Sequence, residues 1–245
     1  MKEFAGTILM LILTAMSVKA SPQEKPAFDI VSTSAGDVEM HFIGHGSLMF
    51  SLNDYHIYID PVRSSGRYDT LPKADLILVT HEHGDHLDAD LINDLRKHET
   101  VLLCSERAAS KISWAQIMKA GDTNVVNDIK IEAVPAYNII HMRSPGQPFH
   151  PKGYGNGYII SIGDKRFYVA GDSENTPEMK NLKNIFVAFL PMNLPYTMTP
   201  AMVADAARAF RPAVLYPYHY GNTNTEEIIN LLKDTDIIVK IRDLK

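Results

Sequence analysis

Cysteine is almost absent from this sequence: Cys104 is the only one among 245 residues. A single cysteine excludes an internal disulfide, and it excludes the thiolate clusters that hold structural zinc. Cys104 follows the apolar run Val101-Leu102-Leu103, so we expect it to be buried at the end of a strand. A metal site in this chain would therefore have to be built from imidazole and carboxylate groups.

A strong excess of charge of one sign is also lacking. The chain has 24 Lys and Arg residues against 29 Asp and Glu residues, a net charge of −5, which gives no basic footprint for nucleic-acid binding. No convincing serine or cysteine triad is visible. Hydrophobic residues make up 45% of the chain, enough for one sizeable core. No linker divides residues 37–245, and we expect a single domain there.

The apolar run at the amino terminus, residues 5–18, is shorter than the ~20 residues that a membrane-spanning helix needs. Lys2 precedes this run, and Val18-Lys19-Ala20 ends it with small residues suited to cleavage. The pattern predicts a signal peptide over residues 1–20. We therefore expect an exported protein, periplasmic or secreted, with no stable membrane span in the mature chain. An uncleaved membrane anchor is the alternative.

Histidine, by contrast, is frequent, and three of the ten histidines lie within six positions. The run His81-Glu82-His83-Gly84-Asp85-His86 puts four metal-ligand side chains within six positions. The apolar residues 74–79 before it predict a buried strand. The acidic residues from Asp88 onward predict the first turn of a helix. The histidines therefore lie on a loop at the carboxyl end of a strand, where open α/β folds usually place their sites.

The spacing within this run predicts two metal positions. His81 and His83 alternate, so both can point at one metal. Asp85 and His86 follow Gly84, which lets the backbone turn and present a second pair to a neighbouring metal. Imidazole and carboxylate suit zinc, and also iron or manganese. A polar loop with chance histidines is the alternative, but ten histidines in 245 residues seldom cluster in this way.

The H-x-H-x-D-H run resembles the signature of the metallo-β-lactamase superfamily, and the resemblance covers residues 38–241. It is similar above all to the branch that includes ascorbate-6-phosphate lactonase and N-acyl phosphatidylethanolamine phospholipase D. The resemblance implies an α/β fold, a four-layer αββα sandwich of two mixed β-sheets flanked by helices. A hairpin followed by an aspartate occurs twice, ending at Asp60 and at Asp172, which fits two related halves.

Apolar patterning and turn residues predict the remaining elements. We expect a polar leader over residues 21–36. We expect strands at 38–43, 48–52, 56–59, 74–79, 101–104, 157–162, 166–170, 187–192, 214–218 and 237–241, with a further hairpin at 124–135. We expect helices from residue 88, over 105–120, over 199–210 and over 225–232.

The resemblance also implies the rest of a dinuclear ligand set. The aspartate that bridges both metals maps onto Asp172, directly after a predicted strand. The last histidine maps onto His219, because no other histidine follows His150. The predicted metal ligands are His81, His83, Asp85, His86, His150, Asp172 and His219.

The third histidine of the first metal site departs from the family pattern. The family usually places it after the strand that ends here at Ala136, where this chain has Tyr137-Asn138. His141 and His150 are the two candidates. We favour His150, because the segment His150-Pro151-Lys152-Gly153 is similar to one in a related subgroup.

The resemblance implies a metal-dependent hydrolase with two divalent cations, zinc in preference to Mn²⁺ or Fe²⁺. A metal-bridging hydroxide would attack a lactone, ester or phosphodiester of a small or lipid-like substrate. Asp85 and Asp172 are the predicted catalytic residues, and Asp85 would accept a proton as the intermediate collapses. The alternative is a non-hydrolytic metal-binding or redox (diiron) protein on the same fold. Diiron relatives carry a carboxylate where this chain has His83, which favours hydrolysis.

Supporting roles are predicted for three other residues. Asp60 can hydrogen-bond a metal-ligating histidine and orient its ring. His45, in the turn Gly44-His45-Gly46-Ser47, either supports the site or serves the turn alone. Lys152 is a candidate to meet an anionic group of the substrate. His41, His56 and His98 are expected on strand faces or at the surface.

Overall fold

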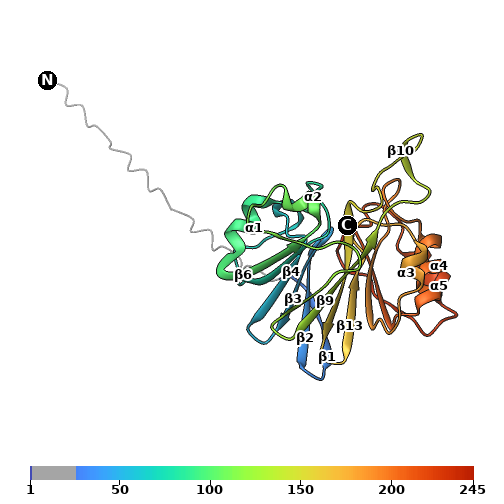
Figure 1. Ribbon diagram of the computed structural model, residues 1–245, viewed down its shortest axis with the longest axis horizontal. Helices are drawn as coiled ribbons and strands as arrows, with labels where there is room; N and C mark the ends of the chain where they lie inside the picture. Colours follow the sequence, from blue (N-terminus) through green and yellow to red (C-terminus); the bar gives the residue numbers. More distant parts are fainter. Residues whose placement is uncertain (2–25) are drawn as a thin grey trace.

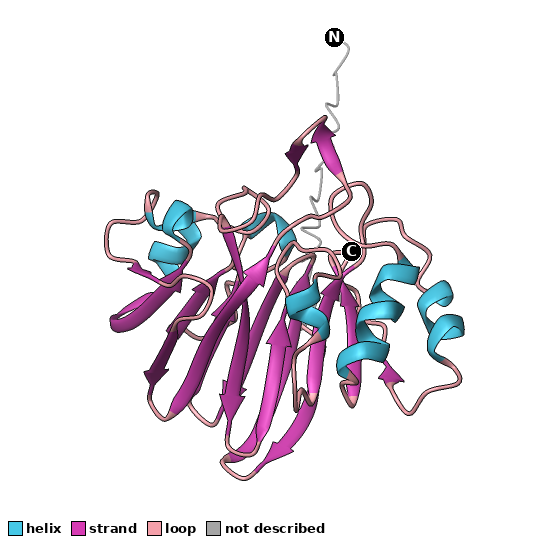
Figure 2. Ribbon diagram, turned by 45° about the vertical axis from the view of Figure 1, so that its right-hand side comes forward, coloured by secondary structure: helices cyan, strands magenta, loops and turns pink. Residues whose placement is uncertain are grey.

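The computed structural model describes residue 1 and residues 26–245. Two seven-stranded β-sheets pack face to face, and helices cover the outer side of each (Figure 1, Figure 2). A separate two-stranded hairpin, β10 with β11, projects from one edge of the sandwich (Figure 1). The predicted four-layer α/β arrangement is confirmed. The predicted signal peptide, apart from residue 1, lies outside the described residues.

The first sheet follows the order of the chain. Its first four strands pair antiparallel and the last three continue in parallel. The strands are β1 (Phe28–Thr33), β2 (Gly36–Gly44), β3 (Ser47–Leu52), β4 (Tyr55–Ile59), β5 (Ala74–Val79), β6 (Arg96–Cys104) and β7 (Gln116–Ile117). A 3-10 turn, Arg63–Ser65, and the helices α1 (Ala89–Leu95) and α2 (Glu106–Ala109) belong to this half.

The second sheet repeats this plan in the order β16-β15-β14-β13-β12-β9-β8. Four antiparallel strands again lead into three parallel ones. The strands are β8 (Thr123–Val126), β9 (Ile129–Ala136), β12 (Gly155–Ile162), β13 (Lys165–Val169), β14 (Val187–Pro191), β15 (Val214–Tyr218) and β16 (Ile238–Val239). The helices are α3 (Pro177–Lys180), α4 (Pro200–Phe210) and α5 (Glu226–Leu232), and the projecting hairpin is β10 (Met142–Ser144) with β11 (Gln147–Pro148). The shared plan agrees with the two halves predicted from the sequence.

The core lies between the sheets and is rich in aromatic rings. Phe189 stacks on Tyr216 with ring centroids 5.0 Å apart, and Phe50 of the first sheet packs against Phe167 and Phe189 of the second. Such rings bury large apolar areas and prefer offset or tilted contacts. A second cluster fills the space under α1 and α2. Cys104 is buried there as predicted, and burial raises the pKa of its thiol to about 12.

Two helix starts show why the sequence folds locally as expected. The Thr199 side chain accepts a hydrogen bond from Met202 N, and Pro200 occupies the first helical position of α4. The Asp88 side chain caps α1 by accepting from Leu91 N at 2.9 Å. The second cap fixes the end of the loop that carries the histidine run.

Two predictions about elements were wrong. Residues 28–33, assigned to a leader, form β1, because they pair with β2 along their whole length and bury Val31. The helix expected over 105–120 stops at Ala109. Turns replace it, and Gln116–Ile117 pairs with Leu103 and Cys104 at the sheet edge. In both segments, pairing with a neighbouring strand outweighs the local pattern.

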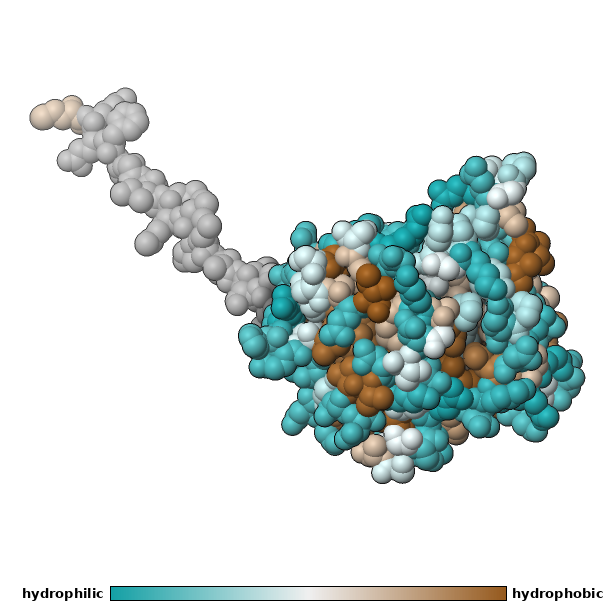
Figure 3. All heavy atoms as spheres, viewed as in Figure 1, coloured by the Kyte–Doolittle hydropathy of each residue, from teal (hydrophilic) through white to brown (hydrophobic). Residues whose placement is uncertain are grey.

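The face of the molecule seen in Figure 3 is mostly hydrophilic, with separate hydrophobic patches. Within residues 26–245, none of the helices has the length and apolar character needed to cross a bilayer.

Candidate metal centre

All seven predicted metal ligands converge at the carboxyl ends of the strands. The loop between β5 and α1 carries four of them, His81, His83, Asp85 and His86. The other three come from separate segments of the second half. They are His150 after the projecting hairpin, Asp172 after β13 and His219 at the end of β15.

The first group consists of His81, His83 and His150, whose ring nitrogens lie within 4.8 Å of one another. His81 Nε2 and His83 Nδ1 are 3.1 Å apart. The rings of His81 and His150 meet edge to face at 5.2 Å. Three imidazoles aimed at one point are a common ligand set for zinc.

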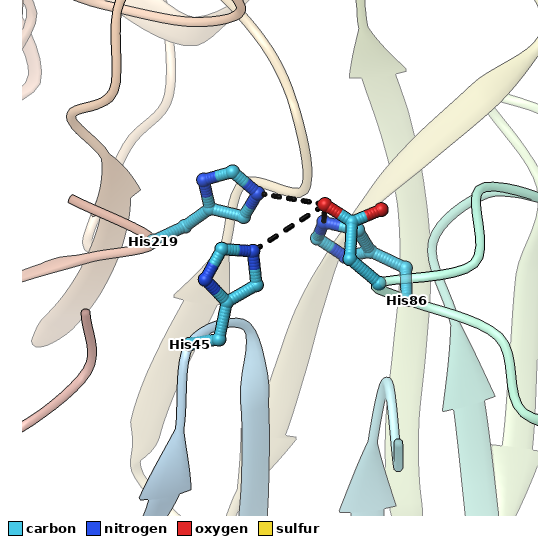
Figure 4. Close-up of side chains that lie close together, drawn as sticks. His45, His86 and His219 are labelled. Carbon is cyan, nitrogen blue, oxygen red and sulfur yellow. Dashed lines mark hydrogen bonds and ion pairs between the residues drawn. The ribbon is translucent and has the colours of Figure 1, made fainter. Parts of the chain in front are cut away.

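The second group consists of Asp85, His86 and His219, and it also includes His45. The Oδ2 atom of Asp85 lies 3.3 Å from His45 Nε2 and 3.4 Å from His219 Nε2. Figure 4 shows the rings of His45 and His219, from two different sheets, pointing at the same carboxylate oxygen. Sequence reasoning left the role of His45 open, and the structure places it in this group.

Asp172 lies between the two groups and faces both. Its Oδ2 is 3.2 Å from His150 Nε2 and 3.6 Å from His219 Nε2, while its Oδ1 is 3.3 Å from His86 Nε2. The side chain is 3% exposed. Burial acts to raise its pKa, but His219, His86 and His150 outweigh burial and hold the pKa well below its usual value. The carboxylate is therefore ionised and available to both groups.

The inner atoms of this cluster have few protein partners. His86 Nε2 and Asp172 Oδ1 are buried and neither makes a hydrogen bond, although such groups normally find one. Burial acts to lower the pKa of His86, but Asp172 and Asp60 raise it well above its usual value. The carboxylates thus favour positive charge at this point, and a divalent cation would supply it. The donor set fits such a cation.

The outer nitrogens of three of these rings, by contrast, are held by oxygen atoms. His86 Nδ1 lies 2.7 Å from Asp60 Oδ2, His81 Nδ1 lies 3.0 Å from Thr80 Oγ1, and His150 Nδ1 lies 2.8 Å from Asn138 Oδ1. Partners of this kind fix the tautomer and the ring orientation of a metal ligand. They leave the lone pairs of the inner nitrogens facing the cluster.

Asp60 is the centre of this support in the first half. It accepts hydrogen bonds from Thr80 N and Thr80 Oγ1, both at 2.7 Å, in addition to the His86 ring. It is fully buried. Asp60 therefore orients His86 directly and His81 through Thr80, which confirms its predicted role as a hydrogen-bond partner of a histidine in the cluster.

Asn138 has the corresponding role for His150, and sequence reasoning missed it. Its side-chain oxygen accepts from both His150 N and His150 Nδ1 at 2.8 Å. His141, the other candidate, instead places its Nδ1 2.7 Å from the buried carboxylate of Glu174. The structure thus brings His150, and not His141, to the cluster. The sequence did contain a signal for Asn138. The pair Tyr137-Asn138 stands where the family usually has a histidine, and the Asn138 side chain at that place contacts the predicted ligand His150.

The turn that carries His45 lies close to the cluster. A Cβ atom on Gly46 would meet His86 Cε1 at 2.9 Å, so only glycine lets the turn approach that ring. His45 Nδ1 lies 2.8 Å from the carbonyl oxygen of Lys245. His41 and His56 lie on outer strand faces, and His98 is exposed, as predicted.

A cavity of about 440 Å³ opens beside the cluster. Besides the cluster residues, its lining includes Arg143, Phe149, Asn193 and Tyr196. Phe149 and Tyr196 pack edge to face with centroids 5.2 Å apart. The cavity is large enough for a small molecule.

Residues 39–219, more than half of the chain, match the sequence profile of the beta-lactamase superfamily domain. A UPF0173 metal-dependent hydrolase of Thermococcus kodakarensis is 30% identical over 201 residues, covering 75% of this chain and 85% of that protein. One from Methanopyrus kandleri is 28% identical over 206 residues, covering 74% and 83%. A crystal structure of a candidate metal-dependent hydrolase from Parabacteroides distasonis superposes with a TM-score of 0.85 at 46% identity, covering 89% of this chain and 99% of that one. None of these names specifies a substrate.

Proposed function

The chain belongs to the beta-lactamase superfamily and is a metal-dependent hydrolase of the UPF0173 kind, and from this premise we propose that it hydrolyses a lactone, ester or phosphodiester at a dinuclear centre. The proposed metals are two divalent cations, zinc in preference to manganese or iron. His81, His83 and His150 would hold the first cation. Asp85, His86 and His219 would hold the second. Asp172 would contact both.

One observation carries this proposal: the outer and inner nitrogens of the histidine rings have different surroundings. Oxygen atoms of Thr80, Asp60 and Asn138 hold the outer nitrogens of three rings, those of His81, His86 and His150. The inner nitrogens face Asp172 and one another. Histidines that served only the fold would not need to direct so many lone pairs into one buried volume.

When bound, the cations would lower the pKa of water toward neutrality and polarise the oxygen of the substrate that is attacked. Hydrolysis then forms a bond from the water oxygen to the carbonyl carbon or phosphorus and breaks the bond to the leaving oxygen. The leaving oxygen gains one proton, and the other water proton needs an acceptor.

Asp85 is placed to handle such a proton. Burial acts to raise its pKa, but hydrogen bonds from His219 and His45 outweigh burial and lower it. Its carboxylate is therefore ionised, and with a lowered pKa it is a weak base that would hold a proton only briefly. The side chain is 49% exposed, so the proton can pass from it to solvent. Asp172, in contrast, is enclosed, and its role would be to position charge.

The test is a panel of esters, lactones, phosphodiesters and lactams, assayed with the purified protein loaded with zinc, manganese or iron. We expect hydrolysis of at least one of the first three classes, its loss on chelation and its loss in Asp85→Asn. The matched control is Asp90→Asn, because Asp90 is exposed on α1. Bound metal without hydrolysis across the panel would contradict the proposal, and redox activity with bound iron would replace it with a diiron function.

A further inference from the structure

The β10–β11 hairpin carries a cationic side chain into the cavity beside the metal centre. Arg143, on β10, lines this cavity together with residues of both ligand groups. Its guanidinium carbon lies 5.6 Å from the centre of the Phe149 ring. The hairpin projects from one edge of the sandwich (Figure 1, Figure 2). Among residues 26–245, Arg143 is the only lysine or arginine that lines this cavity.

Arg143 has no carboxylate partner among residues 26–245. The nearby carboxylates of Asp85 and Asp172 point instead at histidine nitrogens. Other cations close to the site are engaged. Lys152, which we expected to meet an anionic group, pairs with Glu178 at 2.6 Å and lies over the Tyr137 ring. Arg143 is therefore a better candidate than Lys152 to meet an anionic group of the substrate.

The base of the hairpin is fixed to the metal centre. The buried Glu174 carboxylate accepts hydrogen bonds from the backbone N–H groups of Ile139, Ile140 and His141 at 2.6–2.7 Å. Asn138 N donates to His150 O at 2.9 Å, closing the hairpin at its other end. Because Asn138 also orients the His150 ring, the segment that positions a proposed ligand also positions Arg143.

The charge of the cavity favours an anion. Two divalent cations would outweigh the two carboxylates of Asp85 and Asp172, and Arg143 adds a further positive charge. A guanidinium presents a planar fork of donors that matches carboxylate and phosphate oxygens, and it keeps its charge at any working pH. A neutral substrate would leave this exposed fork to water.

We propose that Arg143 binds an oxyanion group of the substrate, a carboxylate or a phosphate, and that the protein acts on anionic esters, lactones or phosphodiesters. The proposal rests on the proposed hydrolase function and narrows its substrate class. Arg143 is a specificity-determining residue in this account, and the Phe149 and Tyr196 rings form the wall against which the anionic substrate lies.

The test uses calorimetric titration of the metal-loaded protein with two matched pairs of probes. Benzoate is compared with benzamide, and phenyl phosphate with phenol. We expect Arg143→Gln to weaken binding of at least one anion by roughly tenfold or more, as expected for loss of a charged hydrogen bond, and to leave the neutral probes unchanged. Arg143→Lys should recover part of the affinity.

The matched control is Lys183→Gln, which removes one exposed positive charge before the amino end of β14, away from the site. Equal anion affinity in wild type and Arg143→Gln, or an equal loss in Lys183→Gln, would overturn the proposal. If benzoate but not phenyl phosphate depends on Arg143, the anionic group is a carboxylate, and the reverse result assigns a phosphate. Metal content is measured in parallel. Protein that holds no metal would contradict the hydrolase proposal, and titrations of the metal-free wild type and Arg143→Gln with the same probes would then decide the role of Arg143 separately.

Discussion

The two halves of the molecule share one sheet plan but deliver their ligands in different ways. The first sheet supplies four predicted ligands from one loop of six residues, 81–86. The second half of the chain supplies three from segments that are far apart in sequence, at His150, Asp172 and His219. Because the carboxyl ends of β5, β13 and β15 meet at one edge of the sandwich, both arrangements reach the same place.

The aspartates that follow the two hairpins show the same contrast in detail. Asp60 comes directly after β4, and Asp172 comes shortly after β13. Both are buried. Asp60 accepts three hydrogen bonds from Thr80 and His86 and so acts behind the ligands. Asp172 faces the inner nitrogens of His86, His150 and His219. Asp60 and Asp172 thus occupy similar positions in the two halves, but Asp60 orients a histidine and Asp172 is a proposed metal ligand.

Removing the Asp172 carboxylate should have the largest effect on metal binding and hydrolysis. Asp172→Ala should abolish hydrolysis and release both metals, because both groups lose a shared oxygen ligand. Metal content and metal affinity measure this. The matched control is Asp164→Ala, at the turn of the same β12–β13 hairpin but at its other end. Retention of both metals by Asp172→Ala would mean that the two groups do not share this residue.

Replacing His150 should have the next largest effect on metal binding, and replacing His141 should have little. His150→Ala should lose or weaken one metal and lower kcat/KM strongly, because the first group keeps only His81 and His83. His141→Ala should keep both metals, since its ring contacts Glu174. Elemental analysis of the two variants decides the assignment. The opposite pattern, with metal lost only from His141→Ala, would contradict the geometry described here.

Asp60→Asn should weaken metal binding less than loss of Asp172 does. Outer partners of ligating histidines typically contribute about 10–100-fold in metal affinity or activity, and the variant turns an amide toward the His86 ring. Competition with a chelator measures the change, and circular dichroism checks that the variant folds. Asp54→Asn, at the exposed turn of the same β3–β4 hairpin, is the matched control. If Asp60→Asn bound metal as tightly as the control, Asp60 would not support metal binding through His86, and this part of the account would be wrong.

The smallest effect on the site should come from Asp29, which ties the halves together away from the metals. This β1 carboxylate pairs with Arg242 at 2.7 Å and Lys240 at 3.1 Å, and it accepts a hydrogen bond from Tyr216 of β15. Burial acts to raise its pKa, but Arg242, Tyr216 and Lys240 outweigh burial and lower it. Asp29→Asn should lower the free energy of unfolding by about 1–3 kcal/mol at pH 7 with metal content unchanged.

The pH dependence of this contribution follows from the lowered pKa. The stabilisation is fully present above the unfolded pKa of about 3.9 and is lost as pH falls through the lower folded value. Denaturant titrations of wild type and Asp29→Asn should therefore begin to converge below about pH 4 and meet only below the folded pKa. A difference between them that persisted unchanged into strong acid would show that charge at Asp29 is not the cause.

The first half of the site was easier to predict because its ligands are local in sequence. In the run 81–86, the spacing of the ligands and the apolar strand before them can be read directly from adjacent residues. His219 and Asp172 were placed by resemblance to a family pattern, and the structure brings both to the cluster. Asn138 and the position of His45 depend on contacts between segments more than 10 residues apart, which no local pattern contains.

The fold shows the same division between local and distant causes. Strands with clear apolar runs, such as β5, β14 and β15, lie where the sequence predicted them. β1 and β7 are edge strands whose pairing depends on the neighbouring strand, and the short β10–β11 hairpin has few apolar residues to mark it. The segment that carries Arg143 was therefore invisible to patterning, although it shapes the cavity.

The most direct test of the dinuclear account is anomalous diffraction from crystals of the zinc-loaded protein. The account predicts two zinc peaks, one enclosed by His81, His83 and His150 and the other by Asp85, His86 and His219, with the carboxylate of Asp172 next to both. A single peak, or peaks held by residues outside these groups, would contradict it.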